Sequence, residues 1–282
     1  MTRETRKSLC LHAAAILVGF AIIAPFLWMG IASISPQANL ISRPLQWLPS
    51  APFLDRYAAI FTGGAEGVGL TFRSAFANTV IVATATVTIS MVIGIFGAYA
   101  FARLKFRFRK TVLMVFLATY MLPQISLLIP LYMILNSLGL LDTKLGLVLV
   151  DCSLVIPFTL WILSNYFLTI PEELEEAARI DGCSRIGALL RVILPSAKPG
   201  IFAAIMFAFL LAWDEFMYAL IFTSSDASKT LPVAISEFAG RYTTDFGLVA
   251  AGGIVAALPP IIIAILFQKY IVSGMAAGAV KG

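Results

Sequence analysis

The chain has 282 residues, of which 60% are hydrophobic and 12% are charged, and its mean hydropathy is +0.94. A soluble domain carries about 25% charged residues, so this composition excludes an ordinary soluble protein and indicates an integral membrane protein. The net charge of +5 does not indicate nucleic-acid binding, because the basic residues lie in short segments beside apolar stretches, where membrane orientation places them.

Six apolar stretches are long enough to cross a bilayer, which requires about 20 residues of helix. They lie at 11–33, 75–101, 111–135, 145–168, 200–222 and 247–270. We expect all of them to be helical, because a backbone polar group left unpaired in lipid is costly. The expected fold class is therefore an all-α polytopic transmembrane bundle of six spans that forms a single domain over 1–282.

Prolines interrupt three of these stretches. Pro123 and Pro130 are expected to break the third span. Pro157 is expected to break the fourth span, and Pro259 and Pro260 the sixth. Such breaks are tolerated where neighbouring helices or a cavity satisfy the freed carbonyl groups, so they suit a bundle around a translocation path.

One face of the second span carries small residues: Gly94, Gly97, Ala98 and Ala102. Small residues let two helix backbones approach closely. Close helix packing is the favoured interpretation of this face, and a subunit interface is the alternative.

Lysine and arginine are distributed unevenly among the segments that connect the spans. Of the 20 in the chain, 14 lie in 1–10, 102–110, 169–199 and the segment from 268 onward, and 6 lie in the other connections. Cytoplasmic segments carry the excess of positive charge, so these four segments are predicted to be cytoplasmic. Both termini are therefore expected in the cytoplasm.

The polar segment 171–195 lies between the fourth and fifth spans and is predicted to form two short helices in the cytoplasm. Pro171 suits the first helical position, and the acids after it lie where the helix dipole favours negative charge. Gly182 is expected to end the first helix in a left-handed conformation, and Ser184 to cap the second. Pro195 is expected to end the second helix.

Each short helix is predicted to carry an apolar face. In the first helix this face is narrow and allows close packing of a partner protein; it is formed by Leu174, Ala177 and Ala178. In the second helix a wider stripe has helical spacing: Ile186, Leu189, Leu190 and Ile193. Three acids of the first helix are interpreted as a solvated face and as partners of the helix dipole: Glu172, Glu173 and Glu175.

This segment resembles the coupling loop of the membrane subunits of ABC importers. The family pattern is Glu-Ala-Ala, three residues, Gly, nine residues, an aliphatic residue, one residue, then Leu-Pro. Here Glu176-Ala177-Ala178, Gly182, Val192 and Leu194-Pro195 have this spacing, with valine at the usual isoleucine position. The alternative is an ordinary acidic helical hairpin. The resemblance implies contact with an ATPase through seven residues: Glu176, Ala177, Ala178, Asp181, Gly182, Leu194 and Pro195.

The resemblance extends over essentially the whole chain, and residues outside the coupling loop narrow the family further. The runs that resemble the smaller maltose-type permease subunit of carbohydrate importers are Asn78-Thr79, Ala98 to Arg103, Trp213-Asp214-Glu215-Phe216, Lys229 to Val233 and Gly274 to Gly282. The family usually has asparagine where this chain has Asp214. That departure places an additional potential charge in the fifth span and leaves the role of Asp214 open.

The resemblance implies a complex of this chain with a second related permease, two ATP-binding subunits and a periplasmic or lipid-anchored solute-binding protein. It further implies a multi-pass protein of the bacterial inner membrane that imports a sugar or sugar-like solute. The sequence has no Gly-x-x-x-x-Gly-Lys-Ser/Thr loop. We therefore expect no catalytic, cofactor or metal site in this chain, and ATP and Mg to be bound by the partner subunits.

Polar and aromatic residues within the fourth and fifth spans are candidates for the translocation path: Asp151, Trp213, Asp214, Glu215 and Tyr218. Charged side chains at membrane depth usually face a cavity or a partner. Two interpretations of Asp214 and Glu215 stay open, namely contact with solute hydroxyl groups and orientation of helices against the sister subunit. Asp151 is also a candidate gate or interface residue.

Two further contacts are implied by the resemblance alone. The outer loop before the last span corresponds to a loop that reaches the binding protein: Arg241, Tyr242, Thr243, Thr244 and Asp245. The tail corresponds to one that contacts the ATPase subunits, through Gly278, Val280 and Lys281. The competing class is a stand-alone secondary transporter or channel, which the cytoplasmic Glu-Ala-Ala segment disfavours. The sequence does not identify the solute.

Overall fold

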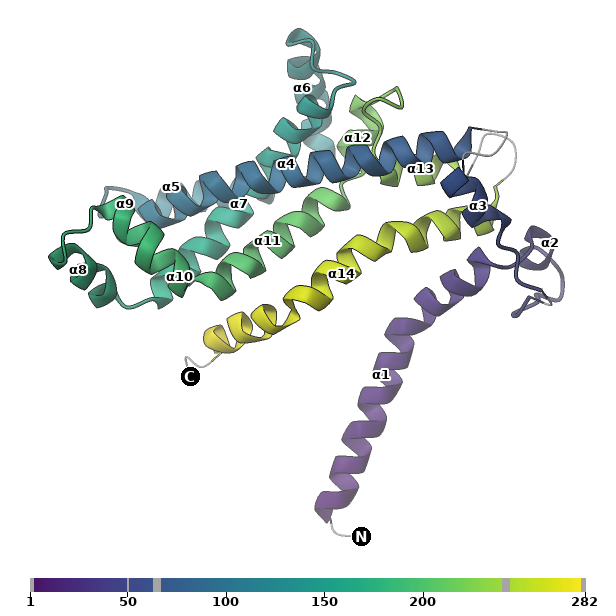
Figure 1. The fold of residues 1–282 in the computed structure, drawn as a ribbon, viewed down its shortest axis with the longest axis horizontal. Helices are drawn as coiled ribbons and strands as arrows, with labels where there is room; N and C mark the ends of the chain where they lie inside the picture. Colours follow the sequence, from purple (N-terminus) through teal and green to yellow (C-terminus); the bar gives the residue numbers. More distant parts are fainter. Residues whose placement is uncertain (1–2, 50, 63–66, 240–243, 280–282) are drawn as a thin grey trace. The chain divides into compact units, whose positions relative to one another are not determined.

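The computed structural model describes residues 3–49, 51–62, 67–239 and 244–279, and every regular element in these ranges is a helix (Figure 1). The chain divides into two compact units. The first unit comprises Met1–Arg73 with Ala234–Leu258, and the second comprises Ser74–Val233 with Pro259–Gly282. The all-helical class predicted from the sequence is confirmed for the described residues.

The first unit contains α1 (Arg3–Ser33), α2 (Gln37–Leu40), α3 (Asp55–Thr62), the start of α4 (Val68–Arg103), most of α13 (Leu231–Glu237) and the first part of α14 (Phe246–Ala279). Its polar centre is Arg56, which is buried. The Arg56 guanidinium pairs with Asp245 at 3.1 Å and donates to the Ser35 carbonyl at 2.5 Å. The apolar side chains of α1 are largely exposed, as suits a helix surrounded by lipid.

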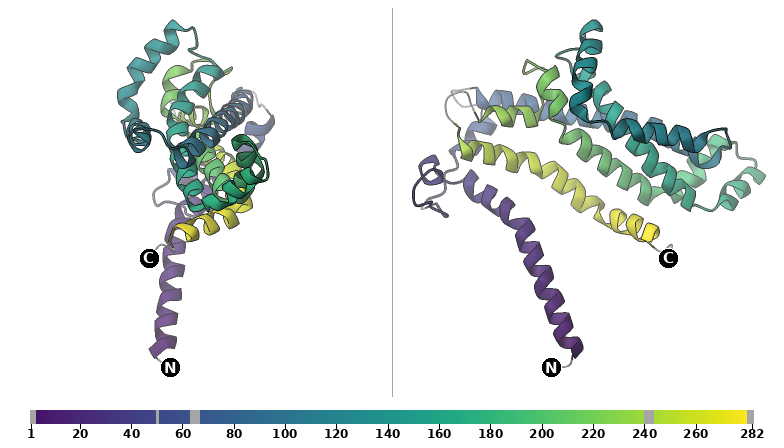
Figure 2. Two further views of the ribbon diagram at one scale, coloured as in Figure 1. Left: turned by 90° about the vertical axis from the view of Figure 1, so that its left-hand side faces the viewer. Right: turned by 180° about the vertical axis from the view of Figure 1, so that it is seen from behind.

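The second unit contains the rest of α4, α5 (Arg109–Tyr120), α6 (Gln124–Ser137), α7 (Lys144–Thr169), α11 (Lys198–Trp213) and α12 (Met217–Phe222). Helices α7 and α11 lie side by side in all views, and α5 also packs against α7 (Figure 1 and Figure 2). This bundle holds both ends of the polar segment between the fourth and fifth spans.

Helix α4 packs closely on α7 through its small residues. A Cβ atom placed at Gly94 would lie 2.6 Å from Cγ2 of Thr159, and one at Gly97 would overlap the Leu160 side chain. Ala98 is buried as well. Close packing is the favoured interpretation of this face, and the structure confirms it.

Within the part of the chain that the structure describes, five helical stretches are long and apolar enough to cross a membrane: Lys7–Ser33, Val68–Arg103, Lys144–Thr169, Lys198–Phe222 and Phe246–Tyr270. The third predicted span instead consists of α5 and α6, which are bent by 92° at the residues before Gln124. Pro123 lies at this bend, as predicted. Six spans result if the bent pair counts as one.

The other prolines do not end their helices, which corrects the prediction of breaks. Pro130 lies inside α6, Pro157 inside α7, and Pro259-Pro260 inside α14. At membrane depth an ended helix would leave further backbone groups unpaired, whereas a proline within a helix frees only one or two carbonyl groups. Continuous helices are therefore retained around these prolines.

Candidate functional site

The segment between α7 and α11 consists of four short helical pieces: α8 (Glu172–Ile180), α9 (Arg185–Ala188), the π-helical turn η1 (Leu189–Ile193) and α10 (Leu194–Ser196). Gly182 has φ = 90°, the left-handed conformation predicted for it. Oγ of Ser184 accepts the Gly187 amide at 3.1 Å, so Ser184 caps α9 as predicted.

Both prolines of this segment occupy positions other than the predicted ones. Pro171 is the residue before the helix and not its first residue. Pro195 lies within α10 and does not end the helical path, which turns only at Ala197. The wider π-helical turn directly before α10 accommodates a residue that has no amide hydrogen to donate.

The residues matched to the coupling pattern differ in accessibility. Glu176, Ala177 and Asp181 are exposed, whereas Ala178 is 8% exposed and packs inside the chain. Ala178 is therefore not accessible to a partner protein on the predicted apolar face of α8. Four apolar side chains of this segment are exposed: Leu174, Ile180, Ile186 and Leu190. Ile180 is 86% exposed, which was not predicted, although a lone isoleucine at the end of an acidic helix is a usable signal.

Glu175 is not part of a solvated face, which corrects its interpretation. The Tyr99 hydroxyl donates to Oε1 of Glu175 at 2.5 Å. Nε of Arg103 lies 3.4 Å from Oε2 of Glu175, an ion pair without hydrogen-bond alignment. The side chains of Arg103 and Glu175 are 4% and 12% exposed. Glu175 therefore joins α8 to the end of α4.

The fifth predicted span is broken where the sequence has no proline or glycine. Helix α11 ends at Trp213, and α12 begins at Met217. The Glu215 carboxylate accepts the amides of Tyr218 at 2.7 Å and Ala219 at 2.9 Å. A carboxylate that satisfies the first amides of α12 stabilises the break at this depth.

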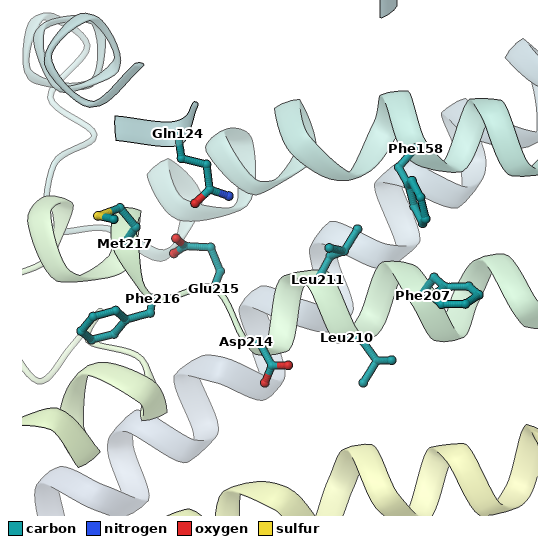
Figure 3. A pocket seen from close by; sticks show the side chains of 9 residues that line it. All are labelled: Gln124, Phe158, Phe207, Leu210, Leu211, Asp214, Glu215, Phe216 and Met217. Atoms are coloured by element: carbon teal, nitrogen blue, oxygen red, sulfur yellow. The ribbon is translucent and has the colours of Figure 1, made fainter. Parts of the chain in front are cut away.

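A cavity of about 400 Å³ opens at this break (Figure 3). It is lined by Gln124, Phe158, Phe207, Leu210, Leu211, Asp214, Glu215, Phe216 and Met217. In Figure 3 the side chains of Gln124 and Glu215 point toward one another. The Asp214 side chain lies on the other side of the backbone that links α11 to α12. The lining combines carboxylate and amide groups with aromatic rings, a combination suited to a hydroxyl-rich solute.

The structure places the five candidate path residues differently. Asp214 and Glu215 line the cavity. Trp213 and Tyr218 are buried among the chain's own aromatic rings, with Trp213 stacked on Phe209 at 5.2 Å between centroids. Asp151 is 2% exposed and lies outside the cavity lining.

The aromatic rings that line this cavity belong to other residues, namely Phe158, Phe207 and Phe216. These three residues were not predicted, because a phenylalanine within an apolar span has no feature in the sequence that distinguishes a cavity wall from a packed helix face.

The candidate binding-protein loop is described only in part, since Arg241, Tyr242 and Thr243 lie outside the described residues. The Thr244 carbonyl accepts from Nε2 of Gln37 at 2.7 Å. Oδ1 of Asp245 accepts the Leu248 amide at 3.0 Å, in addition to the ion pair with Arg56. Asp245 thus fixes the start of α14.

The candidate ATPase-contacting tail is described only at its start. Gly278 lies in the backbone of α14, whereas Val280 and Lys281 lie outside the described residues.

Residues 90–277 match the family model described as "Binding-protein-dependent transport system inner membrane component". The chain belongs to this family. The permease is 36% identical over 276 residues to the sulfoquinovosyl glycerol transport system permease protein SmoH of Agrobacterium fabrum, over 98% of this chain and 94% of that protein. It is 35% identical over 283 residues to the trehalose/maltose transport system permease protein MalG of Thermococcus litoralis, over 100% of both chains.

The permease also matches a solved crystal structure of a bacterial ABC transporter involved in the import of the acidic polysaccharide alginate. The TM-score is 0.75 at 22% identity, over 96% of this chain and 98% of that chain. At this identity the match establishes the fold alone. Family and fold together confirm the expected importer permease and disfavour a stand-alone transporter.

Replacing Glu215 is expected to destabilise the permease in a way that depends on the substitute. Glu215→Ala leaves the amides of Tyr218 and Ala219 without their acceptor, at a cost of about 1–3 kcal/mol. Glu215→Gln retains an acceptor oxygen and is expected to cost less. Thermal unfolding of the purified protein in detergent compares the two variants. Equal midpoints for both would contradict the assigned role of Glu215.

Asp142, in the turn between α6 and α7, fixes the segment after α12. Its carboxylate accepts the amides of Ser224 at 2.9 Å and Ser225 at 3.0 Å and the Ser228 hydroxyl. Desolvation alone would raise the pKa of Asp142, but these hydrogen bonds outweigh it and hold the pKa well below its usual range.

Asp142→Asn is therefore expected to lower stability at neutral pH and to matter less in acid. A carboxyl group whose pKa is lower in the folded than in the unfolded state stabilises the fold above its unfolded pKa of about 3.9. This contribution is lost as the pH falls through the folded pKa. The difference in unfolding midpoint between the permease and D142N is expected at pH 7 and should shrink below about pH 4. A difference that grows on acidification would argue against this role.

Proposed function

We propose that this permease imports a sugar or sugar-like solute across the bacterial inner membrane by alternating access, driven by ATP hydrolysis in partner subunits. The observation that carries the proposal is the segment from α8 to α10, which exposes acids and apolar side chains and joins two membrane-length helices of one compact unit. The exposed apolar side chains offer a contact area, and the acids beside them offer negative charge that a basic surface of a partner complements. On the predicted topology, both termini and this segment face the cytoplasm.

The partners proposed are a second related permease, two ATP-binding subunits and a periplasmic or lipid-anchored solute-binding protein. In this arrangement ATP and Mg bind to the ATP-binding subunits, and the permease itself is non-catalytic. The loop 241–245 contacts the binding protein, with Asp245 anchoring its end. The tail that includes Gly278, Val280 and Lys281 contacts the ATP-binding subunits.

Coupling is proposed to begin at α8. The exposed Glu176 pairs with a basic residue in a cleft of the ATP-binding subunit, and the left-handed turn at Gly182 fixes the direction of the segment. Asp181, Leu194 and Pro195 belong to the same docking segment. When the ATP-binding subunits close, α8 moves as a rigid body and the attached α7 and α11 move with it.

The cavity at the break of the fifth span is the proposed solute contact. Carboxylate and amide groups of Gln124, Asp214 and Glu215 hydrogen-bond solute hydroxyl groups. The rings of Phe158 and Phe207 lie against the apolar face of a sugar. Two similar proteins bear the names of sugar transport permeases, for sulfoquinovosyl glycerol and for trehalose or maltose.

Uptake into proteoliposomes tests the proposed function. The assembled complex and its binding protein are reconstituted with ATP inside, and uptake is measured for labelled disaccharides, sugar alcohols, glycerol phosphates and sulfonated sugars. ATP-dependent uptake of one of these classes is expected. Uptake that proceeds without ATP, or ATP-dependent uptake restricted to amino acids, would contradict the proposal.

A further inference from the structure

The inner end of α4 is joined to α8 by side chains, although the two helices are distant in the sequence. Arg103, the last residue of α4, donates to the Ile170 carbonyl at 2.6 Å and lies 3.7 Å from Oε1 of Glu172. Together with the Tyr99 and Arg103 contacts to Glu175, these interactions form what we call the inner clamp: Tyr99, Arg103, Ile170, Glu172 and Glu175.

Apolar packing reinforces the inner clamp. Tyr99 and Ala102 of α4 belong to one buried cluster with Leu189 and Ile193 of η1. Leu189 and Ile193 are fully buried. Because protein interiors are closely packed, this end of α4 and the segment α8 to α10 cannot shift independently without opening a void between them.

The outer end of α4 is joined to the segment between α12 and α13. Nδ2 of Asn78 donates to the carbonyls of Asp226 at 3.0 Å and Lys229 at 2.9 Å. Oγ1 of Thr79 accepts the Leu231 amide at 2.7 Å. We call these five residues the outer clamp. The outer clamp joins two runs that carried the family resemblance without an assigned role, Asn78-Thr79 and Lys229 to Val233.

Between the clamps, α4 is one continuous helix without proline. The helix from Asn78 to Arg103 is about 37 Å long at 1.5 Å per residue, which exceeds the roughly 30 Å of a hydrocarbon core. Both clamps and the helix between them lie in the second unit. Gly94 and Gly97 of α4 pack closely against Thr159 and Leu160 of α7, so the middle of α4 is held against a neighbouring helix.

The geometry points to α4 as a rigid connection between the segment α8 to α10, where the ATP-binding subunits are proposed to act, and the outer segment 226–231. Its positioning residues are Tyr99, Arg103, Glu175, Asn78 and Thr79. This inference rests on the proposed coupling at α8. Motion of α8 then reaches the outer face through side-chain contacts to a helix that is not covalently adjacent to it. Helices α7 and α11 are then not the only connection along which motion of α8 is transmitted. Helix α7 contains Pro157, and the span of α11 is interrupted between Trp213 and Met217.

Labelling of the outer segment tests the inference with nucleotide as the probe. Ala227 is exposed, so Ala227→Cys reports on this segment in a background of Cys10→Ser and Cys183→Ser. The full complex in nanodiscs is treated with a maleimide with and without a non-hydrolysable ATP analogue and Mg, and labelling of this chain is read by mass. Nucleotide is expected to change the labelling rate by about fivefold or more.

Glu175→Gln at the inner clamp and Asn78→Ala at the outer clamp are each expected to reduce this nucleotide effect to about twofold or less. Tyr99→Phe removes the one hydrogen bond to Glu175. Thr79→Val removes the bond from the Leu231 amide and the bond that the Thr79 hydroxyl donates to the Ala75 carbonyl within α4. These two variants serve if Glu175→Gln or Asn78→Ala fails to assemble. Lys105→Gln is the matched control, because Lys105 is exposed near Arg103 and outside the clamp, and it should keep the full effect. A purely structural role would lower thermal stability without changing the nucleotide dependence.

A full nucleotide effect in either clamp variant overturns the inference. The failure of the proposed function is distinguishable from this result. If Glu176→Lys, which blocks docking at α8, leaves the nucleotide effect unchanged, then the proposed coupling site itself is wrong. If Glu176→Lys removes the effect and the clamp variants retain it, only the role of α4 is wrong.

Discussion

Replacing Glu176 by lysine is expected to abolish solute-stimulated ATP hydrolysis by the complex while leaving the permease inserted and folded. Glu176 is exposed, and exposed substitutions usually change folding stability by no more than about 0.5 kcal/mol. At a docking surface, however, reversing a charge sets like charges against each other at a cost of several kcal/mol. A loss of stimulation of about 100-fold or more follows from a cost of that size. The measurement is the rate of ATP hydrolysis with and without loaded binding protein.

Gly182→Pro is the companion variant. The φ of 90° at Gly182 is inaccessible to proline, whose ring fixes φ near −65°, so the turn after α8 must change direction. Stimulation is expected to be lost here as well. Glu173→Lys, which alters another exposed acid of α8, is the matched control and should retain most of the stimulation. Normal stimulation in both Glu176→Lys and Gly182→Pro would remove the coupling assignment.

Gly146→Ala is expected to have the largest effect on stability, about 3 kcal/mol. Gly146 is buried at the start of α7, and a Cβ atom there would overlap the Leu140 carbonyl oxygen. That oxygen is fixed because it accepts the Thr143 hydroxyl at 2.7 Å, and Oγ1 of Thr143 in turn accepts the Gly146 amide at 3.0 Å. Relief therefore requires movement of the backbone and not of a flexible side chain.

The measurement for Gly146→Ala is the thermal unfolding midpoint of the purified permease. Gly30→Ala in α1 is the control, because a Cβ atom at Gly30 would have no heavy atom within 4 Å and alanine favours a helix. The control should unfold at the same or a higher temperature. Equal midpoints for both variants would show that the turn before α7 relaxes without cost.

The spans were predictable because about 20 apolar residues in a row have few alternatives to a membrane helix. The position of the bend in the third span was predictable from Pro123, but the bend angle of 92° was not. The break at Asp214–Phe216 was not, because it depends on the Glu215 carboxylate reaching the amides of α12. Conversely, Pro157 gave a signal for a break that the surrounding helices override.

The candidate site shows the same division between local and distant causes. The turn at Gly182 and the cap at Ser184 follow from residues within one or two helical turns, and both have the predicted geometry. Glu175 was misinterpreted because its partner Tyr99 lies 76 residues away. Trp213 and Tyr218 were candidates to offer aromatic faces to a solute, but both side chains are buried by helices of the same chain, and such packing is not readable from the local sequence.

The composition of the complex tests the central claim most directly. The permease is tagged at its N-terminus, extracted from its native membrane in mild detergent and weighed intact with whatever co-purifies. We predict one copy of this chain with a second permease and an ATP-binding subunit present twice. Recovery of this chain alone or as a homo-oligomer, under conditions that preserve other importers, would contradict the proposed ATP-driven complex.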